Sequence, residues 1–208
     1  MDSLNGLNMK NVKELMREQS QRRGVSGFTL LELMVVVAIL GIAAAIAVPS
    51  FKSTVSRNQL ISHTQEMAGI IAYARSEASK ASNGRVTLCT SNDINEEPPS
   101  CSSKNENTWD AGWIVFSDDA LLRVGQASTS NLTIRSSGFA SDGRVVFDGT
   151  GAPGTAGTFT LCNDLGVSQA KAVIVSVAGQ SRIAVDESDP ADQIVNDQAG
   201  VNVQCPSV

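Results

Sequence analysis

One carboxylate lies inside the longest apolar stretch of this sequence, and its position raises a question of chemistry. The stretch runs from Phe28 to Val48, and Glu32 is its only charged residue. A carboxylate in a bilayer costs about 3 kcal/mol even on lenient scales, so it usually has a partner. No lysine or arginine lies within one helical turn of Glu32, but cleavage between Gly27 and Phe28 would create a partner. The new α-amine of Phe28 could pair with Glu32 of the same chain or of a neighbouring subunit.

The four cysteines are the second group of potentially reactive residues, and all of them follow the apolar stretch. An even number of cysteines outside the cytosol is typical of disulfides, although the sequence alone leaves the pairing open. We favour Cys89–Cys101, which would close a short polar loop, and Cys162–Cys205, which would hold the C-terminus. The absence of a C-x-x-C motif argues against a zinc or redox site.

Other candidate chemistries have weak support. The single histidine, His63, has no aspartate or cysteine nearby in sequence, so a catalytic dyad is not indicated. The glycine-rich stretch 149–157 lacks the Gly-Lys-Ser/Thr of a phosphate-binding loop. The acidic tract 186–197 could bind calcium, but it has no recognisable loop pattern, and a solvated loop is favoured. We therefore predict no catalytic residue, no metal and no cofactor, so the protein is not expected to be an enzyme.

The N-terminal elements explain how Glu32 would be positioned. At 1.5 Å per residue, a helix over residues 28–48 would extend about 30 Å, which matches a bilayer core. Basic residues precede it: Lys10, Lys13, Arg17, Arg22 and Arg23. Positive charge favours the cytoplasmic side, so we expect a leader over residues 1–27, a single membrane span over 28–48, and the rest outside the cytosol.

The segment after the apolar stretch has the spacing of an amphipathic helix. Its apolar and small residues recur at alternating intervals of four and three, and Ile61 and Ile70 widen the stripe. The stripe consists of Leu60, Thr64, Met67, Ile71, Ala74 and Ala78. We expect this helix to occupy residues 49–84, to be kinked near Pro49 and to end at Asn83-Gly84.

Short β-like runs separated by turn signals fill residues 85–208. The predicted strands are Arg85–Thr90, Gly112–Ser117, Leu121–Val124, Asn131–Ser136, Arg144–Phe147, Thr158–Asn163, Ala172–Val177, Ser181–Val185 and Val201–Gln204. The runs at 172–177 and 181–185 are expected to form a hairpin. The fold class is therefore α+β, with a long N-terminal helix packed on antiparallel β-sheets.

The residues Gly27-Phe28-Thr29-Leu30-Leu31-Glu32 resemble the type III signal of type IV pilins and type II secretion pseudopilins. The resemblance implies that a prepilin peptidase cuts after Gly27 on the cytoplasmic side and N-methylates Phe28. It also implies that Glu32 neutralises the amine of an adjacent subunit during assembly. Pro49 falls where this family often has a helix-kinking proline.

The segment from Thr87 to Asp119 resembles the GspH/FimT branch of the same family. That branch tends to have a cysteine pair followed by a Trp–Asp/Gly–Gly–Trp motif and a Val–Phe–x–Asp stretch. The matching residues here are Trp109, Asp110, Gly112, Trp113, Val115, Phe116 and Asp118. We expect the two tryptophans to pack in the core rather than to form an exposed binding site.

Both resemblances imply a structural minor pilin for pilus priming and biogenesis. The implied partners are other minor and major pilins, the prepilin peptidase and an inner-membrane assembly platform, and the implied location is first the inner membrane and then the pilus. The alternative is an H-type minor pseudopilin that supports protein export by type II secretion.

A third alternative is a DNA-binding minor pilin in natural transformation. Members of this type use a Gly-Arg-x-Arg turn, and the matching residues here are Gly179-Gln180-Ser181-Arg182. Gln180 replaces the first arginine, which leaves Arg182 and the nearby Lys171 as candidate weak contacts. Affinity for phosphates rises with the number of cationic contacts, and the net charge of the chain is −5. The sequence therefore argues against DNA as a partner.

Overall fold

The computed structural model describes residues 27–80, 84–103, 106–118, 120–126 and 131–206. Three parts of the sequence predictions lie outside these residues: the leader up to Ser26, the helix end at Asn83, and Asp119, the last residue of the segment that resembles the GspH/FimT branch. The chain divides after Ala47 into two compact units, which are described separately. The predicted boundaries 28–48, 49–84 and 85–208 stay predictions.

Helix α2 (Leu30–Lys80) contains both the apolar stretch and the amphipathic segment, and Pro49 lies inside it. Its N-terminal part, before the division at Ala47, presents apolar side chains such as Leu31, Leu40 and Ile46 to the surroundings. This part is long and apolar enough to cross a membrane, by length and composition. Such a surface is stable only where lipid or other apolar helices cover it.

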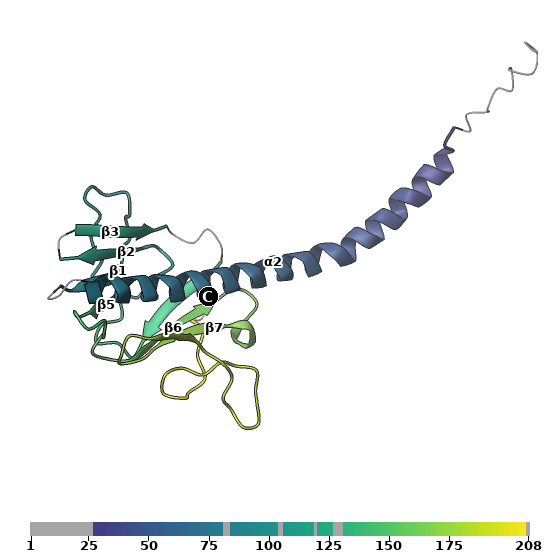
Figure 1. The fold of residues 1–208 in the computed structure, drawn as a ribbon. Helices are drawn as coiled ribbons and strands as arrows, with labels where there is room; N and C mark the ends of the chain where they lie inside the picture. Colours follow the sequence, from purple (N-terminus) through teal and green to yellow (C-terminus); the bar gives the residue numbers. More distant parts are fainter. Residues whose placement is uncertain (1–26, 81–83, 104–105, 119, 127–130, 207–208) are drawn as a thin grey trace, which may run out of the picture. The chain divides into compact units, whose positions relative to one another are not determined.

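In the second unit, α2 buries one face against the β-sheets (Figure 1). The buried residues of the helix are Leu60, Thr64, Met67, Ile70, Ile71, Ala74 and Ala78, which confirms the predicted stripe. The expectation for Ile61 was wrong, because its side chain is 39% exposed. Ile61 follows Leu60 directly and is therefore turned about 100° away from the buried line of the helix.

The strands form two antiparallel four-stranded sheets, with the orders β3-β2-β1-β5 and β4-β6-β7-β8. The first sheet contains β1 (Val86–Thr90), β2 (Trp113–Ser117), β3 (Ala120–Gly125) and β5 (Arg144–Phe147). The second contains β4 (Thr133–Ser137), β6 (Gly157–Cys162), β7 (Lys171–Val175) and β8 (Ser181–Ile183), with a short 3₁₀ helix, η1 (Val167–Gln169), before β7.

The core lies between α2 and both sheets, which confirms the predicted fold class. The buried cluster combines the helix stripe with Leu88 and Phe147 of the first sheet and with Phe159 and Val173 of the second. Residues of β6 and β7 are buried on both faces, because a second cluster covers the other side of their sheet. That cluster includes Ile174, Ala184, Val195 and Val203.

The predicted strand at Val201–Gln204 was wrong. The structure has a single isolated bridge between Asn196 and Asn202 there, and no strand is formed. The carboxylate of Asp197 accepts backbone N–H groups of Ala199 and Val201 and so bends the chain into a turn. The segment therefore covers the second sheet with side chains instead of extending it. The other eight predicted strands are confirmed within a few residues at their ends, including the β7–β8 hairpin.

Candidate functional site

The predicted cleavage junction lies in a non-helical, exposed segment. Gly27, Phe28 and Thr29 precede the helix, which begins at Leu30, and all three are exposed. A peptidase must hold a scissile bond in an extended conformation, which a bond inside a helix cannot adopt without unwinding. The Gly27–Phe28 bond lies outside the helix, so no helical turn has to unwind before a peptidase can bind it.

Thr29 caps the N-terminus of α2, a role that the sequence reasoning missed. Its hydroxyl accepts the backbone N–H of Glu32 at 3.1 Å, and its carbonyl accepts that of Leu33 at 3.1 Å. The spacing Thr-x-x-Glu is the signature of a capping box and could have revealed this role. Glu32 therefore occupies the first helical turn, where the positive end of the helix dipole favours a carboxylate.

This geometry limits how the Phe28 amine could reach Glu32. Phe28 lies before the cap residue, so helical geometry does not hold its amine one turn above the Glu32 carboxylate. The carboxylate itself is exposed on the apolar part of the helix. An exposed carboxylate and an amine that the helix does not hold in place can pair between two copies packed side by side as readily as within one.

The cysteines are joined as two disulfides. Cys89 pairs with Cys101 across a Cα–Cα distance of 5.7 Å, and Cys162 pairs with Cys205 across 5.8 Å. These are the pairings that we favoured from the sequence. The second bond, with a sequence separation of 43 residues, ties the C-terminal segment to β6 and holds it over the second sheet.

Both tryptophans are buried, which agrees with the packing interpretation. Trp109 is 1% exposed, donates its indole N–H to the carbonyl of Asp142 at 2.8 Å, and meets Phe159 edge to face at a centroid distance of 4.8 Å. Trp113 lies so close to Gly125 that a Cβ there would be 1.9 Å from the indole ring. Trp109 thus connects the segment before β2 with β6 of the other sheet.

Asp110 and Asn107 protect the open edge of β4, which the sequence reasoning also missed. The side chain of Asn107 accepts the N–H of Ser136 at 2.7 Å and donates to its carbonyl at 2.8 Å, as a neighbouring strand would. Asp110 accepts the N–H of Ile134 at 3.1 Å and pairs with the guanidinium of Arg135. These side chains form hydrogen bonds with backbone N–H and carbonyl groups at the edge of β4 that could otherwise pair with another strand.

We predict that Asp110→Ala lowers the melting temperature of the detergent-solubilised protein by about 5–10 °C. The change leaves the buried N–H of Ile134 without its acceptor, which costs about 2–3 kcal/mol. Asp110→Asn is the matched control, because its amide oxygen still accepts that N–H while the pairing with Arg135 is lost. The expected order of melting temperatures is wild type, then Asn, then Ala. An alanine variant as stable as wild type would contradict this role.

The two candidate DNA contacts are not brought together. Arg182 is paired with Ile174 across the β7–β8 pair, so these two side chains lie on the same face of the sheet. Lys171 is three residues before Ile174 on β7, and because side chains alternate along a strand, it points to the opposite face. Arg182 also donates to the carboxylate of Glu187 at 3.3 Å. The geometry therefore provides no combined phosphate site from this pair of residues.

The acidic tract 186–197 uses its carboxylates to hold turns. Asp186 accepts the backbone N–H groups of Ser188 at 2.9 Å and Gln193 at 2.7 Å. These hydrogen bonds, the one from Ser188 first, lower the pKa of Asp186. Because the pKa of Asp186 is lower in the folded than in the unfolded chain, its ionised carboxylate stabilises the fold at pH values above the pKa of an unfolded aspartate. This stabilisation is lost as the pH falls through the pKa of the folded state. In the described residues, no three metal-ligating side chains come together.

His63 also has a local partner. Its Nδ1 lies 3.2 Å from a carboxylate oxygen of Glu66, one turn along α2, and the histidine is half-buried. Such a pair at a spacing of three residues is a common surface contact of helices. The arrangement supports the helix and involves no nucleophile.

Two family models match this chain. The model described as type II transport protein GspH matches residues 63–179, and the prokaryotic N-terminal methylation motif matches residues 22–48. Together they cover the cleavage junction, the apolar part of α2 and most of both sheets.

Fimbrial proteins are among the relatives that this chain resembles. The type IV major fimbrial protein FimA of Dichelobacter nodosus is 39% identical over 87 residues, which is 40% of this chain and 54% of that protein. A fimbrial protein of Pseudomonas aeruginosa is 46% identical over 50 residues, which is 24% of this chain and 32% of that protein. The matched stretches thus span about half or less of these relatives. Among solved structures, the type IV minor pilin FimU of P. aeruginosa is 23% identical, covers 66% of this chain and 96% of its own, and has a TM-score of 0.47.

Proposed function

This chain belongs to the GspH family of type II transport proteins, and from that premise we propose that it is a structural minor pilin. In this proposal the chain is cleaved between Gly27 and Phe28, methylated on the new amine, and assembled into a type IV pilus, where it supports pilus priming and biogenesis. It acts by packing against other subunits and catalyses no reaction.

One observation carries the proposal. The methylation motif covers residues 22–48, and inside it the Gly27–Phe28 bond is exposed and stands just before the capped start of α2. Accessibility, a capped helix and an apolar surface beyond it are the three properties that a processed and then assembled subunit needs. Each follows from residues in this stretch, without reference to the rest of the chain.

The finer parts of the proposal concern location and partners. Before assembly the chain is a single-pass protein of the bacterial inner membrane, with its N-terminus in the cytoplasm and both sheets in the periplasm. Basic residues before the apolar stretch and disulfides after it support this orientation. The partners are a prepilin peptidase, an inner-membrane assembly platform, and other minor and major pilins.

Mass spectrometry of two cell fractions tests the proposal. Sheared surface filaments and inner membranes are digested and searched for the peptide that begins at Phe28, with and without an N-methyl group. The methylated peptide in sheared filaments is the expected result. A peptide that runs unbroken across Gly27–Phe28 in the mature protein of both fractions would overturn the proposal.

A second candidate is an H-type minor pseudopilin of type II secretion. The matching family model, described as type II transport protein GspH, favours it, whereas the fimbrial relatives favour the pilus. Methylated peptide confined to the membrane fraction, with the major pilin detected in the sheared fraction as a control for yield, would point to secretion. DNA binding is not favoured, because Arg182 is paired with Glu187 and Lys171 faces the other side.

We predict that Glu32→Ala is inserted and processed normally but enters filaments at least about tenfold less than wild type. Its carboxylate would otherwise neutralise the Phe28 amine of an adjacent subunit in an apolar environment, where the loss of one partner is costly. The measurement is the ratio of filament to membrane protein by immunoblot. Glu32→Gln is the matched control, since it keeps the shape and removes the charge, and it should behave like Ala. Normal incorporation of Glu32→Gln would contradict the role of the charge.

A further inference from the structure

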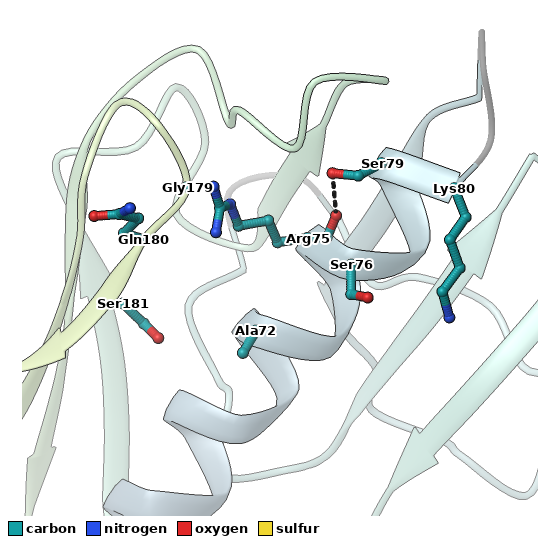
Figure 2. A pocket seen from close by; sticks show the side chains of 8 residues that line it. All are labelled: Ala72, Arg75, Ser76, Ser79, Lys80, Gly179, Gln180 and Ser181. Carbon is teal, nitrogen blue, oxygen red and sulfur yellow. Dashed lines mark hydrogen bonds between the residues drawn. The ribbon is translucent and has the colours of Figure 1, made fainter.

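A pocket of about 660 Å³ lies between the C-terminal turns of α2 and the turn that joins β7 to β8. Figure 2 shows Arg75 reaching from the helix toward the turn that carries Gly179 and Gln180. Polar side chains make up most of the lining, and none of the lining residues is acidic. The lining residues are Ala72, Arg75, Ser76, Ser79, Lys80, Gly179, Gln180 and Ser181.

The stem of Arg75 is held in place by two glycine turns. A Cβ added at Gly151 would be 2.8 Å from Cγ of Arg75, and one added at Gly179 would be 3.2 Å from its Cδ. The same Cβ at Gly179 would be 1.9 Å from the carbonyl oxygen of Gly151, so the two turns also touch each other. Both glycines have positive φ, +78° and +75°, which other residues rarely adopt. The close packing therefore needs glycine at both positions and orients the guanidinium.

The Arg75 guanidinium has no acidic partner among the described residues. No carboxylate of these residues lies within 4.0 Å of it, and its buried Nε makes no hydrogen bond. The other cation of the pocket, Lys80, is already paired with Glu77 at 2.6 Å. A buried donor without an acceptor is costly, and a guanidinium accommodates a carboxylate with two parallel hydrogen bonds.

We infer that this pocket binds the carboxylate of an aspartate or glutamate side chain from a neighbouring pilin-type subunit. The inference rests on the proposed function, since it needs a filament neighbour. Ser76 and Gln180 are exposed at the pocket and supply further donors. This chain itself has 21 acidic against 16 basic residues, so a subunit of similar composition presents an excess of carboxylates. The guanidinium thus fixes the contact between the two folded domains.

A nucleic-acid phosphate would use the same chemistry, but the observations favour a protein carboxylate. Phosphate backbones are bound by several cations in a row, because affinity grows with each contact. Of the nearby cations, Lys80 and Arg182 both have carboxylate partners in the chain itself. One free guanidinium suits a single side-chain carboxylate.

Photo-crosslinking in living cells tests the inference with the full-length chain. The photoreactive residue p-benzoylphenylalanine replaces Ala178, which is exposed in the same turn and does not line the pocket, and the crosslinked peptides are mapped by mass spectrometry. We expect a crosslink to a pilin-type subunit, in a segment that contains an aspartate or glutamate. Arg75→Gln should reduce the yield of this crosslink about tenfold, because it removes one charged, hydrogen-bonded contact. Arg57→Gln, an exposed arginine on the same helix, is the matched control and should leave the yield unchanged.

Two further variants separate binding from folding. Arg75→Lys keeps the aliphatic stem and the positive charge, so it should give a higher crosslink yield than Arg75→Gln. The two variants should have equal melting temperatures, which would show that the difference in yield does not come from folding. Arg75→Glu should lose the crosslink and regain it when the mapped acid of the partner is changed to arginine. The proposed role of the pocket would be overturned by any of four outcomes. These are an Arg75→Gln crosslink yield equal to wild type, a crosslinked partner segment without an acidic residue, a crosslink to nucleic acid, and no crosslink in filaments that contain the chain. Absence of the chain from filaments would instead overturn the proposed function.

Discussion

Gly27→Leu is expected to leave the chain as uncleaved precursor in the membrane, with processing reduced more than about tenfold. A Cβ added at Gly27 meets no atom of the described residues within 4 Å, so we expect the substitution to leave the folded part of the substrate undisturbed. Any loss of cleavage must therefore arise where the peptidase holds the residue before the scissile bond. A site that accepts a glycine closely excludes a larger side chain by steric clash. The measurement is the ratio of precursor to processed chain on an immunoblot.

Gly27→Ala is the matched control for this experiment. It adds one methyl group at the same exposed position, so we expect partial processing, between that of wild type and that of the leucine variant. Complete processing of Gly27→Leu, verified by a peptide that begins at Phe28, would show that cleavage does not depend on this residue. The glycine requirement before the scissile bond would then have to be abandoned, whereas a mature N-terminus at any residue other than Phe28 would overturn the junction itself.

Trp109→Ala is expected to unfold the two-sheet domain or to make it strongly unstable. The change removes a fully buried indole, its edge contact with Phe159 and the donor to the Asp142 carbonyl. Large-to-alanine changes at buried aromatic positions cost about 3–5 kcal/mol, a large part of the stability of an ordinary domain. The measurement is thermal unfolding of the full-length protein in detergent, followed by circular dichroism and by the fluorescence of the remaining Trp113.

Trp109→Phe separates packing from hydrogen bonding at this position. It retains most of the apolar surface but leaves the Asp142 carbonyl without the indole N–H, so we expect a loss of about 1–2 kcal/mol. The variant should still fold. An alanine variant that melts within about 2 °C of wild type would show that Trp109 does not connect the sheets in the way proposed here.

The local features of this protein were predictable from the sequence because neighbouring residues produce them. The buried stripe from Leu60 to Ala78 follows from helical spacing alone, and Ile61 was misplaced because the stripe is narrower than its apolar content suggested. Eight short strands were found because turn residues separate them. Val201–Gln204 failed for a local reason too, since the Asx turn at Asp197 outweighed the β-like composition.

Contacts between distant segments could not be predicted in the same way. An alternating strand pattern indicates a buried face but does not name the neighbouring strand, so the separation of β4 and β5 into different sheets was invisible. Asp110 reaches Ile134 across 24 positions in sequence, and Lys171 and Arg182, close in the chain, point to opposite faces of one sheet. These relations depend on strand pairing and register.

The sequence by itself determined the apolar helix with its one carboxylate and the class of the fold, and it supplied the proposed cleavage junction. Each of these depends on residues within a few turns of one another, so spacing and composition suffice. Only the tertiary structure decided the capped edge of β4 and the pocket in which two glycine turns hold Arg75. The first arises where the segment before β2 packs on β4, and the second where two turns pack on α2. No local pattern encodes which of these segments will meet.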